Sequence, residues 1–365
     1  MSVGQDPVSD PAPLRIDAVS RAEQARVRAE ARLACTITDF FLDTDARLDE
    51  RTRLALAHVL DGIVGTIEAD IRGHAARLLA KGGDPARGEA LLRPGRSVVA
   101  RLKRSNLLLD DELMGELIAR VRHDLIAEAL PIASAGPEEA SLLVRLASVP
   151  DRVVASAATA LLATESRRRT ANEDGTVAGS ELPAELHHRL LWWIAAAIRE
   201  GLADGDTASD RAIGAAALRC LSAHDEGDRP EAVAMRLAAA IDARPEEIAA
   251  LVVEAIGDRR LSLFVAVLAR TLGIDFDQMR AITLESGGDR LWLALRAADL
   301  DRATIARIGL ALSDADPRRD VETFADALDA IAAVTVADAR AALGPLTLHR
   351  DFRAAMRALA KSDRR

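Results

Sequence analysis

The residues best suited to chemistry or recognition gather in one short run of sequence, HHRLLWW, which begins at His187. It holds two of the three tryptophans beside two histidines and an arginine. Trp and Arg are enriched among the residues that dominate the binding energy of protein interfaces. Because neighbouring residues of a helix point about 100° apart, the two tryptophan rings cannot share one face. We therefore predict a partner-binding surface formed by His187, His188, Arg189, Trp192 and Trp193. The alternative is that both rings are buried in the core.

The seven histidines lack the spacing that a metal site on a helix requires. Two ligands on one helical face must be three or four residues apart, and no His-x-x-x-His or His-x-x-Glu-His pair occurs. Cys35 and Cys220 are the only cysteines, too few for a disulfide framework or a cysteine-based zinc site. Each lies among apolar residues, so we expect two core thiols. We predict neither a metal nor a cofactor.

The chain also lacks the usual motifs for phosphate binding and nucleophilic catalysis. The glycine-rich stretch from Lys81 to Gly88 lacks the Gly-Lys-Ser/Thr ending of a phosphate-binding loop and has no preceding strand, so we expect an ordinary loop. Neither a G-x-G-x-x-G turn between a strand and a helix nor a G-x-S-x-G motif is present. We predict no catalytic residues and no enzymatic activity. A site assembled from distant residues is the remaining route to catalysis.

The charge of the chain disfavours two classes of partner. It has 48 basic and 57 acidic residues and a formal net charge of −9, whereas phosphate groups require a concentrated basic surface. Nucleic acid and anionic membrane are therefore disfavoured, and Arg167–Arg169, close to Glu165, is expected in a solvated loop. The longest strongly apolar stretch, 190–198, is too short to cross a bilayer. Because residues 1–20 lack a secretory signal pattern, we expect a cytoplasmic protein without membrane insertion.

Composition and periodicity predict an all-α protein. The chain is 49% hydrophobic but only 2% aromatic, and we find no period-2 run of β-branched residues. Apolar residues instead recur with the helical period, for example from Leu56 to Leu78, where three glycines are expected to interrupt the helix. A similar stripe runs from Phe352 to Leu359 near the end of the chain. We expect such stripes to be buried in the core.

Several helix starts are marked by residues that satisfy the first backbone amides. Asp110 precedes an apolar stripe, and its charge suits the positive end of a helix dipole. Thr335 and Asp338 have the spacing of a capping box. Pro230 and Pro245, each followed by Glu, fit the first turn of a helix, where the missing N–H costs nothing.

These signals predict about twelve to sixteen short helices joined by brief turns, which favours stacked helical hairpins, an α-solenoid, over a single four-helix bundle. The polar stretch 165–181 separates two periodic regions, so we expect two lobes. The predicted organisation is a disordered arm at 1–13, an N-terminal helical-repeat lobe at 14–164, a linker or long loop at 165–181, and a C-terminal helical-repeat lobe at 182–361.

Four segments together resemble a known family: Glu68–Ala80, Ser97–Ile118, Leu182–Glu200 and Asp258–Ile282. They are similar to an alphaproteobacterial family of HEAT-like helical-repeat proteins that is catalogued as a domain of unknown function. The resemblance covers most of the chain from Glu50 to Asp314. It implies a curved stack of helix pairs in a bacterial cytoplasm and brings no catalytic residues with it.

Fold class and missing chemistry together suggest a function. Because each repeat of a solenoid contacts only its neighbours, such folds present long surfaces, and protein binding is their commonest use. We expect a non-enzymatic scaffold or regulatory adaptor that binds a protein partner or a second copy of itself. The alternative is a nucleic-acid-binding helical-repeat regulator that uses arginines on a concave face.

Overall fold

The protein is all-helical. A computed structural model describes residues 42, 47–93, 95–132, 140–174, 179–202 and 207–362, and these contain helices and no strand. The chain divides into two compact units, Met1–Asp49 and Glu50–Arg365, and every helix discussed below belongs to the second. The arm predicted at 1–13 lies outside the described residues. The predicted all-α class is therefore confirmed.

The α-helices of the second unit are these: α2 (Glu50–Lys81), α3 (Pro85–Leu92), α4 (Val98–Arg104), α5 (Asp111–Ala129), α6 (Leu142–Ala147), α7 (Arg152–Asp174), α8 (Ala184–Glu200), α9 (Thr207–Ala223), α10 (Pro230–Ile241), α11 (Pro245–Gly257), α12 (Leu261–Leu272), α13 (Phe276–Thr283), α14 (Asp289–Ala297), α15 (Arg302–Ala315), α16 (Val321–Ala333), α17 (Val336–Leu343) and α18 (Arg350–Ser362). None of the helices that the structure describes is long and apolar enough to cross a membrane.

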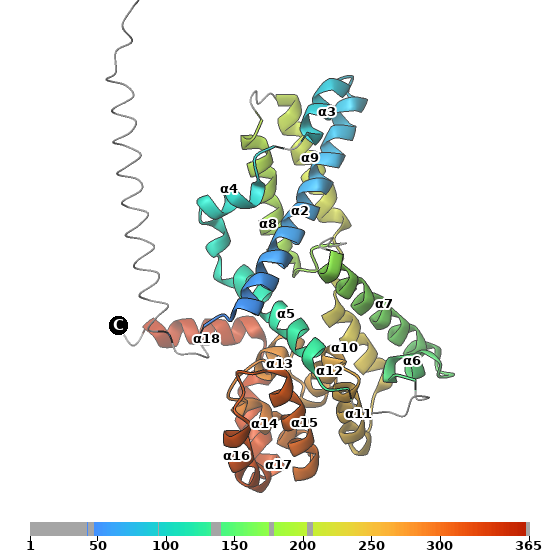
Figure 1. Cartoon of the computed structure of the whole chain (residues 1–365), viewed down its shortest axis with the longest axis vertical. Coiled ribbons are helices and arrows are strands. Elements are labelled where there is room, and N and C mark those ends of the chain that lie inside the picture. Colours follow the sequence, from blue (N-terminus) through green and yellow to red (C-terminus); the bar gives the residue numbers. More distant parts are fainter. Residues whose placement is uncertain are drawn as a thin grey trace, which may run out of the picture. The chain divides into compact units, whose positions relative to one another are not determined.

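Helix α2 shows how an apolar stripe organises its neighbours. Most of its stripe, including Ile63, Val64 and Ile71, is buried, although Leu78 at the end of the stripe is exposed. The helix packs beside α3, α5, α8 and α9 (Figure 1). The interruptions expected at its glycines do not occur, and the helix is continuous over 32 residues. A glycine inside a helix costs only about 1 kcal/mol relative to alanine, which is less than burying so long a stripe contributes.

The local start signals identify the helix ends correctly. The Asp110 carboxylate accepts a hydrogen bond from the Leu113 amide at 2.8 Å and caps α5. The Thr335 hydroxyl accepts from the Asp338 amide at 3.1 Å and caps α17. Pro245 occupies the first turn of α11, as expected. These contacts reach at most three residues along the chain, so the sequence determines them without tertiary information.

The linker predicted at 165–181 is wrong over its first ten residues. Residues 165–174 continue helix α7. One cluster of buried apolar residues joins the two sides of this region, because it includes residues from Ile126 to Leu161 and from Val233 to Leu343. Parts of the two predicted lobes therefore share one core. Polar composition suggested a loop here, but Arg168 and Glu165 are packed against oppositely charged groups, whereas Arg167 and Arg169 are exposed on the same helix.

Tight packing in the C-terminal half brings α14, α15 and α16 together. The Trp292 ring lies 4.5 Å from the Phe324 ring, centroid to centroid, and both residues are buried. The α15 backbone at Gly309 lies directly against the same phenylalanine ring, which leaves no room there for a side chain. Trp292 is thus a core residue.

Helix α18 differs from the others because its large apolar side chains face solvent. Phe352, Met356 and Leu359 are 58%, 49% and 69% exposed. On another side of the helix, the half-buried Arg353 pairs through Nη2 with Asp275 Oδ2 at 3.3 Å, at the start of α13. The expectation that this stripe is buried is therefore wrong: the periodicity predicts the helix correctly but does not reveal what its apolar side contacts.

Candidate functional site

A neutral network of buried ion pairs lies where α5, α7, α10, α13 and the segment before α8 meet. Its side chains are at most 19% exposed. We call it the ion-pair network, and its members are four arginines and four acids: Arg120, Arg168, Arg229, Arg280, Glu116, Asp124, Glu181 and Glu231. Helix α5 supplies three of them, at spacings of four residues, so they share one helical face.

Glu231 is the centre of the network. Its carboxylate oxygens lie 3.1 Å from Arg168 Nη1, 3.6 Å from Arg229 Nε and 3.7 Å from Arg280 Nη1. Burial by itself raises the pKa of Glu231, but these three guanidinium groups outweigh it and hold that pKa far below its ordinary value. Glu231 also lies in the first turn of α10, where the helix dipole favours negative charge. The carboxylate therefore stays ionised.

Two further glutamates connect the arginines to the rest of the fold. Glu116 on α5 accepts hydrogen bonds from Arg229 at 3.2 Å and from Arg280 at 3.1 Å. Glu181 pairs with Arg168 at 2.7 Å and with Arg120 at 3.0 Å. Removing one partner of such a pair leaves an uncompensated buried charge, at a cost of about 3–5 kcal/mol. The network thus fixes the positions of these helices.

A polar cavity of about 510 Å³ lies beside the network. We call it the histidine cavity, and its characteristic residues are His74 of α2, Arg120 of α5, Ser180, His187 of α8, Cys220 of α9, and His224 directly after α9. Arg229, a member of the network, also lines it. The cavity depends on the packing of α2 against α8 and α9, which the apolar stripe of α2 produces.

His187 is the central histidine of this cavity. Its ring stacks on His224 with 4.0 Å between centroids, and its Nδ1 lies 2.7 Å from Ser180 Oγ. Nε2 makes no hydrogen bond within the described residues. Burial, together with His224 and His188, lowers the pKa of His187 from 6.5 to about 4. The imidazole is therefore neutral at physiological pH.

The described residues of the cavity do not complete a nucleophilic triad. Ser180 and His187 form a hydroxyl–imidazole pair, but no carboxylate orients the imidazole through its second nitrogen, as a nucleophilic triad requires. Burial and the nearby Asp70 raise the pKa of Cys220, so this half-buried sulfur is a thiol and not a thiolate at neutral pH. The described residues contain no group of three His, Cys, Asp or Glu side chains that could hold a metal ion.

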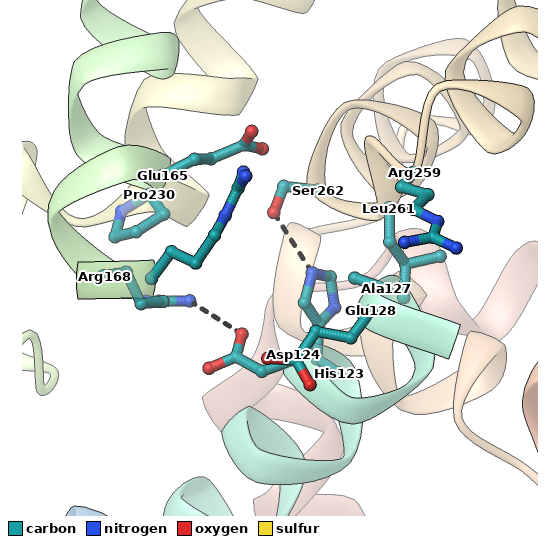
Figure 2. Close-up of a pocket in the computed structure, with 11 residues that line it drawn as sticks. His123, Asp124, Ala127, Glu128, Glu165, Arg168, Pro230, Arg259, Leu261 and Ser262 are labelled. Carbon is teal, nitrogen blue, oxygen red and sulfur yellow. Dashed lines mark hydrogen bonds and ion pairs between the residues drawn. The ribbon is translucent and has the colours of Figure 1, made fainter. Parts of the chain in front are cut away.

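Arg168 also lines a second, smaller pocket of about 80 Å³ (Figure 2). In it His123 Nε2 lies 3.1 Å from Ser262 Oγ, and Asp124 faces Arg168 at 3.7 Å (Figure 2). Burial lowers the pKa of His123 from 6.5 to about 4. Glu165, also in this pocket, has its pKa raised by burial although Arg260 pairs with it at 2.7 Å. This volume is below that of ordinary ligand sites, and the pocket is lined mainly by residues of α5, α7 and α12.

The structure separates the residues predicted on α8. His187 is buried in the histidine cavity, whereas His188 is exposed and accepts a hydrogen bond from Trp192 Nε1 at 3.2 Å. Arg189 forms ion pairs with Asp110 and, at 2.7 Å, with Glu112 at the start of α5. Trp192 and Trp193 are each half-buried. His187 therefore does not belong to a surface with the other four, and neither tryptophan is fully buried.

Sequence reasoning missed the ion-pair network, above all Arg168. The run Arg167–Arg169 was expected in a solvated loop, yet Arg168 is only 6% exposed and donates to Glu181 and Glu231. One signal could have identified it. Val154, Ala158 and Leu161 form the buried stripe of α7, and steps of four and three residues extend that stripe through 165 to 168. A charged residue on such a stripe requires a buried partner.

Comparison with known proteins gives one match. A family model described as "Uncharacterised protein conserved in bacteria (DUF2336)" matches residues 132–344, which is more than half of the chain and spans α6 to α17. Neither the curated proteins nor the solved structures give a match to the chain.

Proposed function

The chain belongs to the DUF2336 family of bacterial proteins, and on that premise we propose that it is a non-enzymatic adaptor that binds a protein partner. The observation that carries the proposal is helix α18, which exposes the apolar side chains Phe352, Met356 and Leu359. An ordinary surface helix buries its apolar stripe and exposes its charges. In α18 the apolar stripe is exposed instead, and contact of this stripe with water costs free energy unless a partner covers it.

The chemistry of α18 defines the partner that fits it. The three apolar residues lie at positions i, i+4 and i+7, which is the pattern of anchors in an amphipathic helix that lies in a groove. The sequence of the helix also has four basic residues and one acidic residue, while the whole chain is acidic. We therefore propose a partner protein with an apolar groove bordered by acidic side chains.

The exposed area gives the size of the expected effect. Complete burial of one large apolar side chain contributes about 1.5–3 kcal/mol, and roughly half of each of the three is still exposed. Covering the stripe therefore contributes about 3 kcal/mol, which corresponds to roughly 100-fold in affinity. The exposed side of α8, with His188, Trp192 and Trp193 half-buried or exposed, is proposed as a second and smaller contact surface.

The same proposal extends to architecture and location. Neighbouring helices such as α2 and α3, α6 and α7, and α8 and α9 contact each other, which supports HEAT-like hairpins as the repeating unit. We propose a cytoplasmic protein of alphaproteobacterial type, with hairpins that present their outer faces to partners. Pairings distant in sequence, such as α2 with α9 and α7 with α10, distinguish this arrangement from a simple linear stack.

The test compares two triple variants in capture from the cytosol of the source bacterium, each analysed with and without nuclease. The first replaces Phe352, Met356 and Leu359 by Ser. The control replaces Leu54, Val153 and Leu218 by Ser, because these residues are 63%, 68% and 59% exposed and lie singly on α2, α7 and α9. The control therefore removes as much exposed apolar surface without touching the stripe of α18.

We expect a nuclease-resistant protein partner in stoichiometric amount with the wild type and the control, and its loss with the α18 variant. Equal recovery of that partner by all three chains contradicts the proposal. Recovery that disappears with nuclease contradicts it in favour of the nucleic-acid alternative. Both variants should retain the helicity and melting cooperativity of the wild type, because the substituted side chains are exposed.

A further inference from the structure

The histidine cavity contains buried hydrogen-bond donors that have no acceptor among the described residues. His187 Nε2 and Arg120 Nε both line the cavity region and make no hydrogen bond there. The two residues are only 6% and 2% exposed, so bulk water does not reach them freely. Buried polar groups are nearly always paired, and exceptions beside a cavity indicate a bound molecule.

His187 and Arg120 both contact Ser180. His187 Nδ1 lies 2.7 Å from Ser180 Oγ, and Arg120 Nη1 donates to the Ser180 carbonyl oxygen at 3.2 Å. Arg120 also pairs with Glu181 at 3.0 Å. The imidazole and the guanidinium are therefore each held by neighbours at the inner end of the cavity, while His187 Nε2 and Arg120 Nε stay without a hydrogen bond.

One tautomer of neutral His187 suits a ligand. Ser180 Oγ lies 2.7 Å from His187 Nδ1 and accepts from the Leu182 amide at 3.5 Å, so its own O–H can donate to Nδ1. In that tautomer the imidazole proton is on Nε2, which is then a donor. An N–H of neutral histidine and an N–H of arginine together match an acceptor with two oxygens, such as a carboxylate.

The outer part of the cavity favours a cationic group, whereas the inner end favours an anionic one. Asp70, Asp225 and Asp228 line it and are exposed, and Arg167 is the exposed arginine among them. Counting every charged lining residue, three arginines face four carboxylates. A simple anion such as phosphate would add negative charge to a cavity that already has a small excess of it. A ligand that is anionic at the inner end and cationic at the outer end balances both.

We propose that the histidine cavity binds a small zwitterion of the free amino acid class, with its carboxylate on His187 and Arg120 and its ammonium group among Asp70, Asp225 and Asp228. The volume of about 510 Å³ lies within the range of small-molecule sites. The site is independent of α18 and of any protein partner. Because Arg120 and Arg229 line the cavity and also belong to the ion-pair network, the ligand contacts the groups that position α5 and α10.

Cys220 provides a reporter because it lines the same cavity and is half-buried. In the full-length chain with Cys35→Ser, Cys220 is the only cysteine. The measurement is the rate at which iodoacetamide alkylates Cys220 at alkaline pH, with each of the free amino acids at millimolar concentration. Four control probes are used. Acetate carries only the carboxylate of the ligand and ethylamine only its ammonium group, alone or in an equal mixture, and inorganic phosphate carries only negative charge. Thermal unfolding with the same probes is the second readout.

We expect at least one amino acid to slow alkylation several-fold and to raise the melting temperature, and the four control probes to have little effect. His187→Phe retains a flat ring against His224 but removes the Nε2 donor, and should weaken this protection at least about tenfold. His188→Phe, at the exposed neighbour, should leave it unchanged. Asp228→Asn tests the outer end of the cavity in a chain whose core is untouched, and should also weaken the protection.

Three results overturn the proposal. One is that no amino acid protects Cys220 more than acetate and ethylamine do, which indicates a cavity that holds ordered water only. Another is that phosphate protects as well as the amino acids, which indicates a simple anion site. The third is protection that persists unchanged in both His187→Phe and Asp228→Asn. If His187→Phe fails to fold, the Asp228→Asn result decides alone.

Discussion

The close approach of α15 and α16 at Gly309 allows a sharp test of the packing, by the substitution Gly309→Ala. A carbon added at Gly309 would lie 2.8 Å from Cε2 of Phe324 and closer still to two other atoms of that ring. The ring cannot turn away easily, because Phe324 is only 6% exposed and packs on Trp292. The added methyl group must therefore displace a buried aromatic ring.

Two opposing effects determine the magnitude. Replacing a helical glycine by alanine contributes about 1 kcal/mol of stability through helix propensity. Overpacking a rigid core costs about 1–3 kcal/mol, and because the added carbon would lie so close to the Phe324 ring, we expect a cost near the upper end of that range. We expect Gly309→Ala to destabilise the protein by about 1–2 kcal/mol. Gly65→Ala on α2 has nothing within 4 Å of the added carbon, so it should stabilise the protein by about 0.5–1 kcal/mol.

Urea unfolding followed by far-UV circular dichroism measures both variants against the wild type. The double variant Gly309→Ala/Phe324→Leu provides the control, because a smaller side chain at 324 makes room for the methyl group and the two substitutions should couple favourably. A Gly309→Ala midpoint equal to or above that of the wild type, with Gly65→Ala behaving as expected, would refute the packing described for α15 and α16.

Three further predictions concern the charged residues. Arg168→Ala should lower the free energy of unfolding by about 3–5 kcal/mol in urea titrations, because it leaves Glu231 buried without its nearest cation, whereas Arg167→Ala at the exposed neighbour should change it by at most about 0.5 kcal/mol. The pKa of His123 is 6.5 in the unfolded chain but about 4 when folded, because the residue is buried. In this window only the unfolded chain is protonated, so stability should fall by up to about 3 kcal/mol as the pH decreases from 6.5 to 4, and His123→Gln should reduce this slope in urea titrations at several pH values. Asp320→Ala removes the acceptor for two amides at the start of α16 and should cost about 1 kcal/mol in thermal unfolding.

The helices and their first residues could be predicted because their causes are local. Asp110, Thr335 and Pro245 act on backbone groups within one helical turn, so the interacting groups are neighbours in the sequence. The apolar stripe of α2 could also be predicted from its periodicity, although the glycines within it were expected to interrupt the helix. A stripe that long stabilises a helix by more than single glycines destabilise it.

The ion-pair network and the histidine cavity could not be predicted, because their members meet only in the folded chain. Arg168 and Glu231 are 63 residues apart, and no periodicity links them. Between 165 and 174 the same residue types that indicate a solvated loop occur in a helix that buries Arg168 on one face, and only knowledge of the buried partner distinguishes the two structures. Helix α18 shows the reverse case, since a regular apolar stripe predicts a helix without specifying what covers it.

The position of Glu116 in the ion-pair network has a consequence for how the protein is made. Its partners Arg229 and Arg280 come 113 and 164 residues later in the chain. At about 5–20 residues per second, a ribosome needs roughly 8–30 s to synthesise the stretch from Glu116 to Arg280. Until then the α5 carboxylates must remain hydrated, so α5 cannot take its final place early in translation. The amino-terminal helices are therefore exposed to chaperones and proteases until most of the chain has been synthesised.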